Sequence, residues 1–103
     1  MGARARTSEG RSAPDVAGTE RLRIDKWLWH ARVVRTREAA AALSVSGHVR
    51  INGARAVAPA APVRLGDVVT IALDHGVRVL RVCGFASRRG DADEARQLFE
   101  DIA

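Results

Sequence analysis

The chain has little of several residue types, and each shortage excludes a class of protein. It has a single cysteine, Cys83, so neither a disulfide within the chain nor a multi-cysteine metal site can form. Two Trp, two Phe and no Tyr argue against a deep aromatic pocket. No apolar run approaches the roughly 20 residues of a membrane span, and the N-terminus has no apolar signal-peptide core. We therefore expect a soluble, cytoplasmic protein.

Motifs for catalysis and metal binding are also missing. His30, His48 and His75 are far apart in the sequence and do not have the spacing of metal ligands. There is no P-loop, no Gly-x-Ser-x-Gly and no zinc-protease motif. The adjacent pair Asp74-His75 is more typical of a turn than of a catalytic pair. The sequence predicts a protein that is not an enzyme and needs no cofactor, metal or small-molecule substrate.

Positive charge, in contrast, is abundant and concentrated in one segment. The formal net charge is +5, and residues 21–50 carry seven basic residues against two acidic ones, while each of the other segments sums to zero. A localised excess focuses a positive field on a polyanion, whereas scattered charge mainly keeps a protein in solution. This favours a nucleic-acid partner over a solvated basic face. The basic residues are Arg21, Arg23, Lys26, Arg32, Arg35, Arg37 and Arg50.

Apolar spacing in the same segment predicts two short helices. The first has its apolar face on Ile24, Trp27, Leu28, Ala31 and Val34. Asp25 is placed to cap this helix, and a break is expected near Arg35. Thr36 is a good N-cap for a second, alanine-rich helix that ends before Gly47.

After Gly47 the apolar period changes to two, which predicts strands. Residues 48–57 form a hairpin with Asn52-Gly53 as its turn, and residues 68–73 and 77–85 form two further strands. Pro59 and Pro62 should interrupt any strand between them, and the last strand changes parity, which suggests a bulge.

Asp91 opens a helix with an apolar stripe on Ala95, Leu98, Phe99 and Ile102. Because it is acidic, this helix should dock away from the basic surface. The expected fold class is α+β: a helix-turn-helix hairpin packed on a small antiparallel β-sheet, with a C-terminal helix.

Several side chains are candidates for contact with a polyanion. Arg32, Arg35 and Arg37 surround the break between the helices, where Thr36 and the free amides of the second helix can hold a phosphate. Trp29 lies about 140° from Ile24 on the helical wheel, so it is a base-stacking candidate, a platform for an arginine, or a packing residue against later segments. His48, Arg50, Asn52 and Arg55 project from or flank the hairpin, although the Asn-Gly turn itself requires Asn52.

These residues resemble the S-4-type RNA-binding domain, named after the fourth protein of the small ribosomal subunit. The matching stretches are Arg23-Ile24-Asp25, Leu28, Thr36-Arg37, Ala40, Gly47-His48-Val49-Arg50-Ile51-Asn52-Gly53 and Gly66-Asp67. Two stretches are similar to the heat shock protein 15 subgroup: Asp25-Lys26-Trp27-Leu28-Trp29-His30-Ala31-Arg32 and Arg88-Arg89-Gly90. The chain then divides into a flexible tail (1–20), the S-4-type domain (21–86) and a C-terminal helical extension (87–103).

The resemblance implies a protein that binds ribosomal RNA on large ribosomal subunits still carrying a nascent chain on transfer RNA, and that aids their rescue or recycling under heat stress. We also expect the protein to be a monomer. It also implies, by position, RNA contacts from Arg23, Lys26, Thr36, Arg37, His48, Arg50 and Asn52. Ser44 departs from the family, which has an aliphatic residue there. A general structured-RNA or transfer-RNA binder and a protein interaction adaptor remain alternatives.

Overall fold

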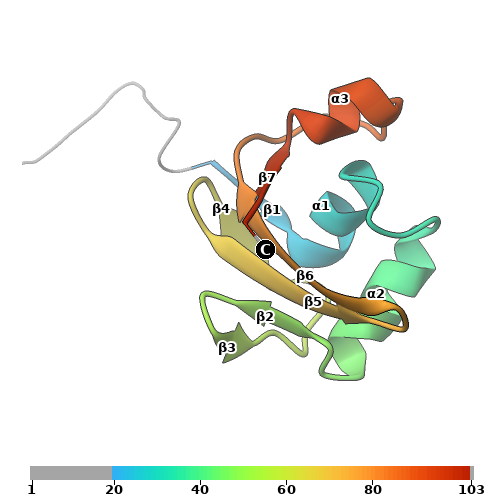
Figure 1. The fold of residues 1–103 in the computed structure, drawn as a ribbon, viewed down its shortest axis with the longest axis vertical. Helices are drawn as coiled ribbons and strands as arrows, with labels where there is room; N and C mark the ends of the chain where they lie inside the picture. The colour runs from blue at the N-terminus through green and yellow to red at the C-terminus, as the bar shows by residue number, and fades with distance from the viewer. Residues whose placement is uncertain (1–19, 103) are drawn as a thin grey trace, which may run out of the picture.

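Figure 1 shows the computed structural model, which describes residues 20–102, so that nearly all of the predicted tail lies outside the described residues. Two helices cover one face of an antiparallel sheet, and a third short helix lies beyond the end of the first. The predicted α+β fold class is confirmed. The elements in chain order are β1 (Arg21–Arg23), α1 (Ile24–His30), α2 (Arg37–Val45), β2 (Val49–Ile51), β3 (Ala54–Arg55), β4 (Pro62–Arg64), β5 (Val68–Leu73), β6 (Gly76–Val82), α3 (Ala92–Arg96) and β7 (Phe99–Asp101).

The core lies between the helices and the sheet. Ile24, Trp27 and Leu28 on α1 are fully buried, as their spacing predicts. They pack in one cluster with strand residues that include Val49 and Ile71. The indole Nε1 of Trp27 donates a hydrogen bond to the carbonyl of Gly84 at 3.1 Å, so the polar atom of this buried ring is satisfied.

Helix α1 begins and ends differently from the prediction. Arg23, not Asp25, is at the N-cap position, and no side chain caps the helix. The amides of Ile24 and Asp25 instead donate to carbonyls of Ala61 and Pro59. The helix ends after His30, one turn earlier than expected, because the chain enters the left-handed region directly after Ala31.

Helix α2 follows the prediction closely. The Thr36 hydroxyl accepts a hydrogen bond from the amide of Ala39 at 3.0 Å, as an N-cap does. At the other end Gly47 has a φ of 80°, and the amide of His48 donates to the carbonyl of Leu43. This is a Schellman motif, in which glycine takes the left-handed position at low cost.

The main sheet has five antiparallel strands in the order β3-β2-β5-β6-β7. The Asn52-Gly53 turn is confirmed, with both residues at positive φ. The predicted bulge is wrong, since β5 and β6 pair in continuous register from Val68 with Arg81 to Leu73 with Gly76. The parity change in β6 arises because the strand presents Leu80 and Val82 to the core and Val77 to the outer face.

A second, two-stranded sheet pairs β1 with β4 and was not predicted. Pro62 does not prevent a strand but opens one, opposite Arg23. In a two-stranded sheet each strand has a free side, where the missing proline N–H costs nothing.

The predicted C-terminal helix is only partly present. A capping box of Asp91 and Glu94 starts α3 as expected, but the helix ends at Arg96. Phe99 lies in β7, where it pairs with Val82 of β6. Pairing with the open edge of β6 satisfies backbone groups that a longer helix would leave exposed, which overrides the helical apolar spacing.

Candidate nucleic-acid interface

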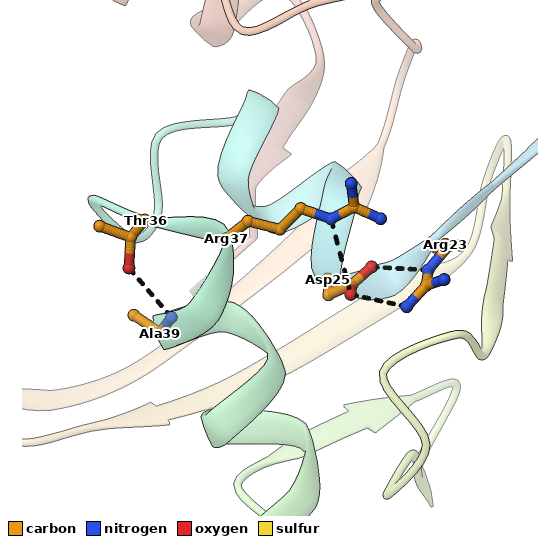
Figure 2. Close-up of polar contacts among 5 residues, drawn as sticks. All are labelled: Arg23, Asp25, Thr36, Arg37 and Ala39. Carbon is orange, nitrogen blue, oxygen red and sulfur yellow. Dashed lines mark hydrogen bonds and ion pairs between the residues drawn. The ribbon is translucent and has the colours of Figure 1, made fainter.

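One buried carboxylate organises the start of both helices of the hairpin. Asp25 is 3% exposed, and its two oxygens accept hydrogen bonds from Nε and Nη2 of Arg23 at 3.1 and 2.9 Å. Nε of Arg37, at the first position of α2, lies 3.7 Å from the same carboxylate (Figure 2). The two arginine side chains remain 49% and 40% exposed. Asp25 therefore orients two cations whose outer parts face solvent.

The α2 N-terminus adds a further positively polarised element to this cluster. The Thr36 side chain is occupied by the amide of Ala39 (Figure 2), so it supports the helix start. The first amides of a nine-residue helix point outward and carry a partial positive charge. Arg37 lies at the same end, where its charge opposes the helix dipole but reinforces attraction for an anion.

Three further cations lie on the helical hairpin. The side chains of Lys26 and Arg35 form no hydrogen bond or ion pair with any residue between 20 and 102. Arg32 has a φ of 59° and donates from Nη1 to the carbonyl of Gly90 at 2.7 Å. We call Arg23, Lys26, Arg32, Arg35, Thr36 and Arg37 the helical basic surface.

The hairpin candidates do not join this surface through any described contact. Because Val49 points into the core, Arg50 leaves the sheet on the outer face, opposite the helices. Arg55 is its cross-strand partner and is exposed as well. His48, directly before β2, is exposed. Arg50 and Arg55 thus form a second, smaller basic patch.

Asn52 has its amide groups engaged within the fold. Its Oδ1 accepts a hydrogen bond from the amide of Val68, and its Nδ2 donates to Asp67 at 3.0 Å. The residue has a φ of 53°, which asparagine tolerates better than most residues. The side chain ties the β2–β3 turn to the turn before β5.

Trp29 is half-buried and serves as a platform for an arginine, one of the roles expected for it. The guanidinium carbon of Arg89 lies 5.9 Å from the centre of the indole ring. Arg89 also donates from Nε to the carbonyl of Trp29 and from Nη2 to the carbonyl of Val34. The segment just before the acidic helix reaches the hairpin, since the carbonyl of Gly90 accepts a hydrogen bond from Arg32.

His30 is a buried polar residue that the sequence did not single out. It is 1% exposed, and its Nδ1 has no hydrogen-bond partner among the described residues. Burial lowers the pKa of His30, and the nearby charges of Lys26, Arg37 and Arg89 lower it further, while the carbonyl of Ala86 opposes them. An imidazole with a lowered pKa therefore lies buried at the C-terminal end of α1.

Residues 20–102 contain neither a metal-binding cluster nor a membrane-spanning helix. This part of the chain holds no group of three or more His, Cys, Asp and Glu residues that could bind a metal ion. None of the helices described above is both long and apolar enough to cross a bilayer.

Comparison with known proteins relates this chain to S4-domain proteins and to heat shock protein 15. Residues 22–69 match the model of the S4 domain family. Heat shock protein 15 of Escherichia coli K12 is 35% identical over 82 residues, which is 80% of this chain and 61% of the relative. The Haemophilus influenzae homologue is 31% identical over 80 residues, 78% of this chain and 60% of that one. This chain therefore spans about three fifths of the length of these relatives.

A trimeric structure of heat shock protein 15 from Vibrio cholerae is similar in three dimensions. It superposes with a TM-score of 0.75 at 36% sequence identity, covering 82% of this chain and 84% of that one. The structural similarity extends beyond the S4 segment, because the superposed region covers 82% of the chain and residues 22–69 are a smaller part of it.

Proposed function

Since the chain belongs to the family of S4-domain proteins that includes heat shock protein 15, we propose that it is a non-catalytic protein that binds structured RNA through the helical basic surface. The observation that carries the proposal is the arrangement around Asp25. One buried carboxylate holds Arg23 and Arg37 side by side, next to the exposed N-terminus of α2. Arginine forks and helix amides are both suited to phosphate oxygens.

The mode of binding follows from the chemistry of this surface. Phosphate contacts fix position and orientation, and the A-form shape of RNA supplies selectivity without base contacts. Arg50 and Arg55, on the outer face of the sheet, would then contact RNA only if it also reaches the β2–β3 edge. The contacts proposed for His48 and Asn52 are secondary, because Asn52 already has two partners within the fold.

Salt dependence tests the proposal directly. If about four phosphates are neutralised, the logarithm of affinity falls with the logarithm of salt concentration at a slope of roughly −3 to −4. We expect this slope when a labelled RNA hairpin is titrated with the full chain at several salt concentrations. A slope near zero would rule out a phosphate-binding surface.

We further propose that the RNA is ribosomal RNA of the large subunit, and that the protein acts in the cytoplasm on subunits retaining a nascent chain on transfer RNA. The names of the relatives support a role in heat stress. Cosedimentation with empty subunits, with nascent-chain-bearing subunits and with free transfer RNA distinguishes this role from general RNA binding. Equal affinity for all three would leave the general binder as the function.

A protein adaptor remains the alternative from another class. Replacing Arg32, Arg35 and Arg37 by alanine should abolish ribosome association if RNA is the partner, whereas an adaptor would keep its protein partner. The sequence predicts a monomer, while the Vibrio cholerae relative was solved as a trimer. Light scattering of the purified chain, with and without RNA, determines which state binds.

A further inference from the structure

Arg89 connects the C-terminal extension to the link between α1 and α2. Its Nε donates to the carbonyl of Trp29 at 3.0 Å, and its Nη2 donates to the carbonyl of Val34 at 3.2 Å. The guanidinium also lies over the ring of Trp29. These partners are 55 and 60 residues away in sequence. One half-buried side chain thus connects the last turn of α1 to the segment that follows it.

The link needs such support because its backbone is in an unusual conformation. Arg32 has a φ of 59°, at a position where helices commonly place glycine. Its amide donates to the carbonyl of Trp29, and the amide of Val33 donates to Leu28, which completes a Schellman motif with arginine in the left-handed position. A non-glycine residue there costs of order 1 kcal/mol, so the surrounding contacts must hold it in place.

Arginine suits position 89 better than lysine does. A planar guanidinium presents donors in fixed directions, so it can reach two carbonyls and stack on an indole at the same time. Its charge also lies at the C-terminus of α1, where the helix dipole favours a cation. The next residue adds a reciprocal contact, since the carbonyl of Gly90 accepts the hydrogen bond from Arg32.

We propose that Arg89 is a positioning residue for RNA binding. It holds the link between α1 and α2 so that Arg32, Arg35 and Thr36 are in place before RNA arrives, and it makes no phosphate contact itself. The inference rests on the proposed function, because it concerns the same helical basic surface. Preorganisation of this kind raises affinity by removing the entropy cost of ordering a segment on binding.

The test compares Arg89→Lys with Arg88→Lys, which makes the same chemical change one residue earlier. Arg88 is 71% exposed and contacts Glu94 and the carbonyl of Arg89. For a labelled RNA hairpin we expect Arg89→Lys to weaken binding by about tenfold and to make the salt slope shallower by about one. Arg88→Lys should stay within about twofold of the wild type. If Arg89 contacted phosphate directly, lysine would largely retain the affinity.

A double-mutant cycle separates positioning from a general loss of structure. In a chain carrying Arg32→Ala and Arg35→Ala, the link has no arginine left to position, so adding Arg89→Lys should have little further effect. Thermal unfolding and amide exchange show whether the fold persists, and faster exchange is expected in residues 31–36 alone. A loss of the same size in both backgrounds would overturn the inference.

The two proposals fail in different ways. If the wild-type chain binds no RNA at any salt concentration, the proposed function is wrong and the role of Arg89 falls with it. If the wild type binds RNA and Arg89→Lys binds equally well, RNA binding stands and only the positioning role is lost.

Discussion

Asp25 and Ser44 are both buried polar residues of the helical hairpin, and their surroundings differ. Asp25 accepts two hydrogen bonds from Arg23 and has Arg37 nearby. Ser44 is fully buried, and its hydroxyl has no hydrogen-bond partner among the described residues. A buried group of this kind loses its bonds to water without replacement. The sequence marks position 44 only as a departure from the family, which has an aliphatic residue there.

Ser44→Ala should therefore stabilise the protein. Removing the unpaired hydroxyl, together with the better helix propensity of alanine, should raise the free energy of unfolding by about 1 kcal/mol. Urea denaturation followed by tryptophan fluorescence measures this change. Ser46→Ala is the control, because the hydroxyl of Ser46 is exposed and donates to the carbonyl of Ala42. Equal or lower stability in Ser44→Ala would show that the hydroxyl is satisfied in solution.

His30 makes stability depend on pH. Because burial lowers its pKa, the folded protein resists protonation at a pH where the unfolded chain, with a pKa near 6.5, already takes up a proton. The unfolded state then binds more protons, so the free energy of unfolding decreases as pH falls below about 6.5. Lys26, Arg37, Arg88 and Arg89 add positive charge around the ring, and Glu94 lines the same pocket.

Substituting His30→Gln should remove part of this dependence. Urea denaturation between about pH 7 and about pH 5 should show a smaller loss of stability in the variant than in the wild type. His75→Gln, in the exposed turn between β5 and β6, is the control and should retain the wild-type slope. Identical slopes in all three proteins would mean that His30 does not contribute.

At the scale of elements, the structure depends on contacts between turns. The β2–β3 turn is bound to the segment before β5 through Asn52, which pairs with Asp67 and with the amide of Val68. Asp67 in turn accepts a hydrogen bond from the amide of Arg64 at 2.9 Å. Two tight turns that are distant in sequence therefore support each other through one amide–carboxylate pair.

Exchanging the two partners tests this pair. Asn52→Asp places two carboxylates together and should lower the free energy of unfolding by about 1 kcal/mol. Adding Asp67→Asn restores a donor and an acceptor in reversed order, so the double variant should recover most of the loss. Chemical denaturation of the single and double variants measures both effects. A double variant as unstable as the sum of the singles would exclude the pairing.

At the scale of the whole molecule, the arginines of the C-terminal region and those of the helical basic surface differ in their ion pairing. The arginines of the β6–β7 region and the extension are mostly neutralised by nearby acids: Arg78 by Asp101, Arg81 by Glu100, Arg88 by Glu94 and Arg96 by Asp93. Arg89 is the exception, and it binds backbone carbonyls. The zero net charge of residues 77–103 thus corresponds to actual ion pairs, while the helical basic surface keeps its excess.

Single substitutions in the two regions should reveal this difference. Arg35→Ala removes an exposed cation of the helical basic surface and should weaken RNA binding about three- to tenfold, with a shallower salt slope. Arg81→Ala removes a cation already paired with Glu100 and should change affinity less than about twofold. Both variants should unfold at nearly the wild-type temperature. Equal losses of affinity would indicate RNA contact in both regions.

Sequence alone determined the features whose causes are local. Thr36 caps α2, Gly47 ends it and Asn52-Gly53 turns the hairpin, because each depends on the conformational preference of one or two residues. The spacing of apolar residues, helical in α1 and alternating in the strands, likewise predicted which faces pack in the core. The location of the net charge could be counted directly from the sequence.

Tertiary structure decided which charged residues are paired within the fold and which are exposed to a binding partner. The contact of Asp25 with Arg37, the pairing of β1 with β4 and the end of α3 at Arg96 depend on groups that come together only when the chain folds. Arg89 illustrates the reason, because its carbonyl partners lie 55 and 60 residues away and no local preference predicts them. Charge is a property of each residue, whereas its pairing or exposure depends on long-range packing.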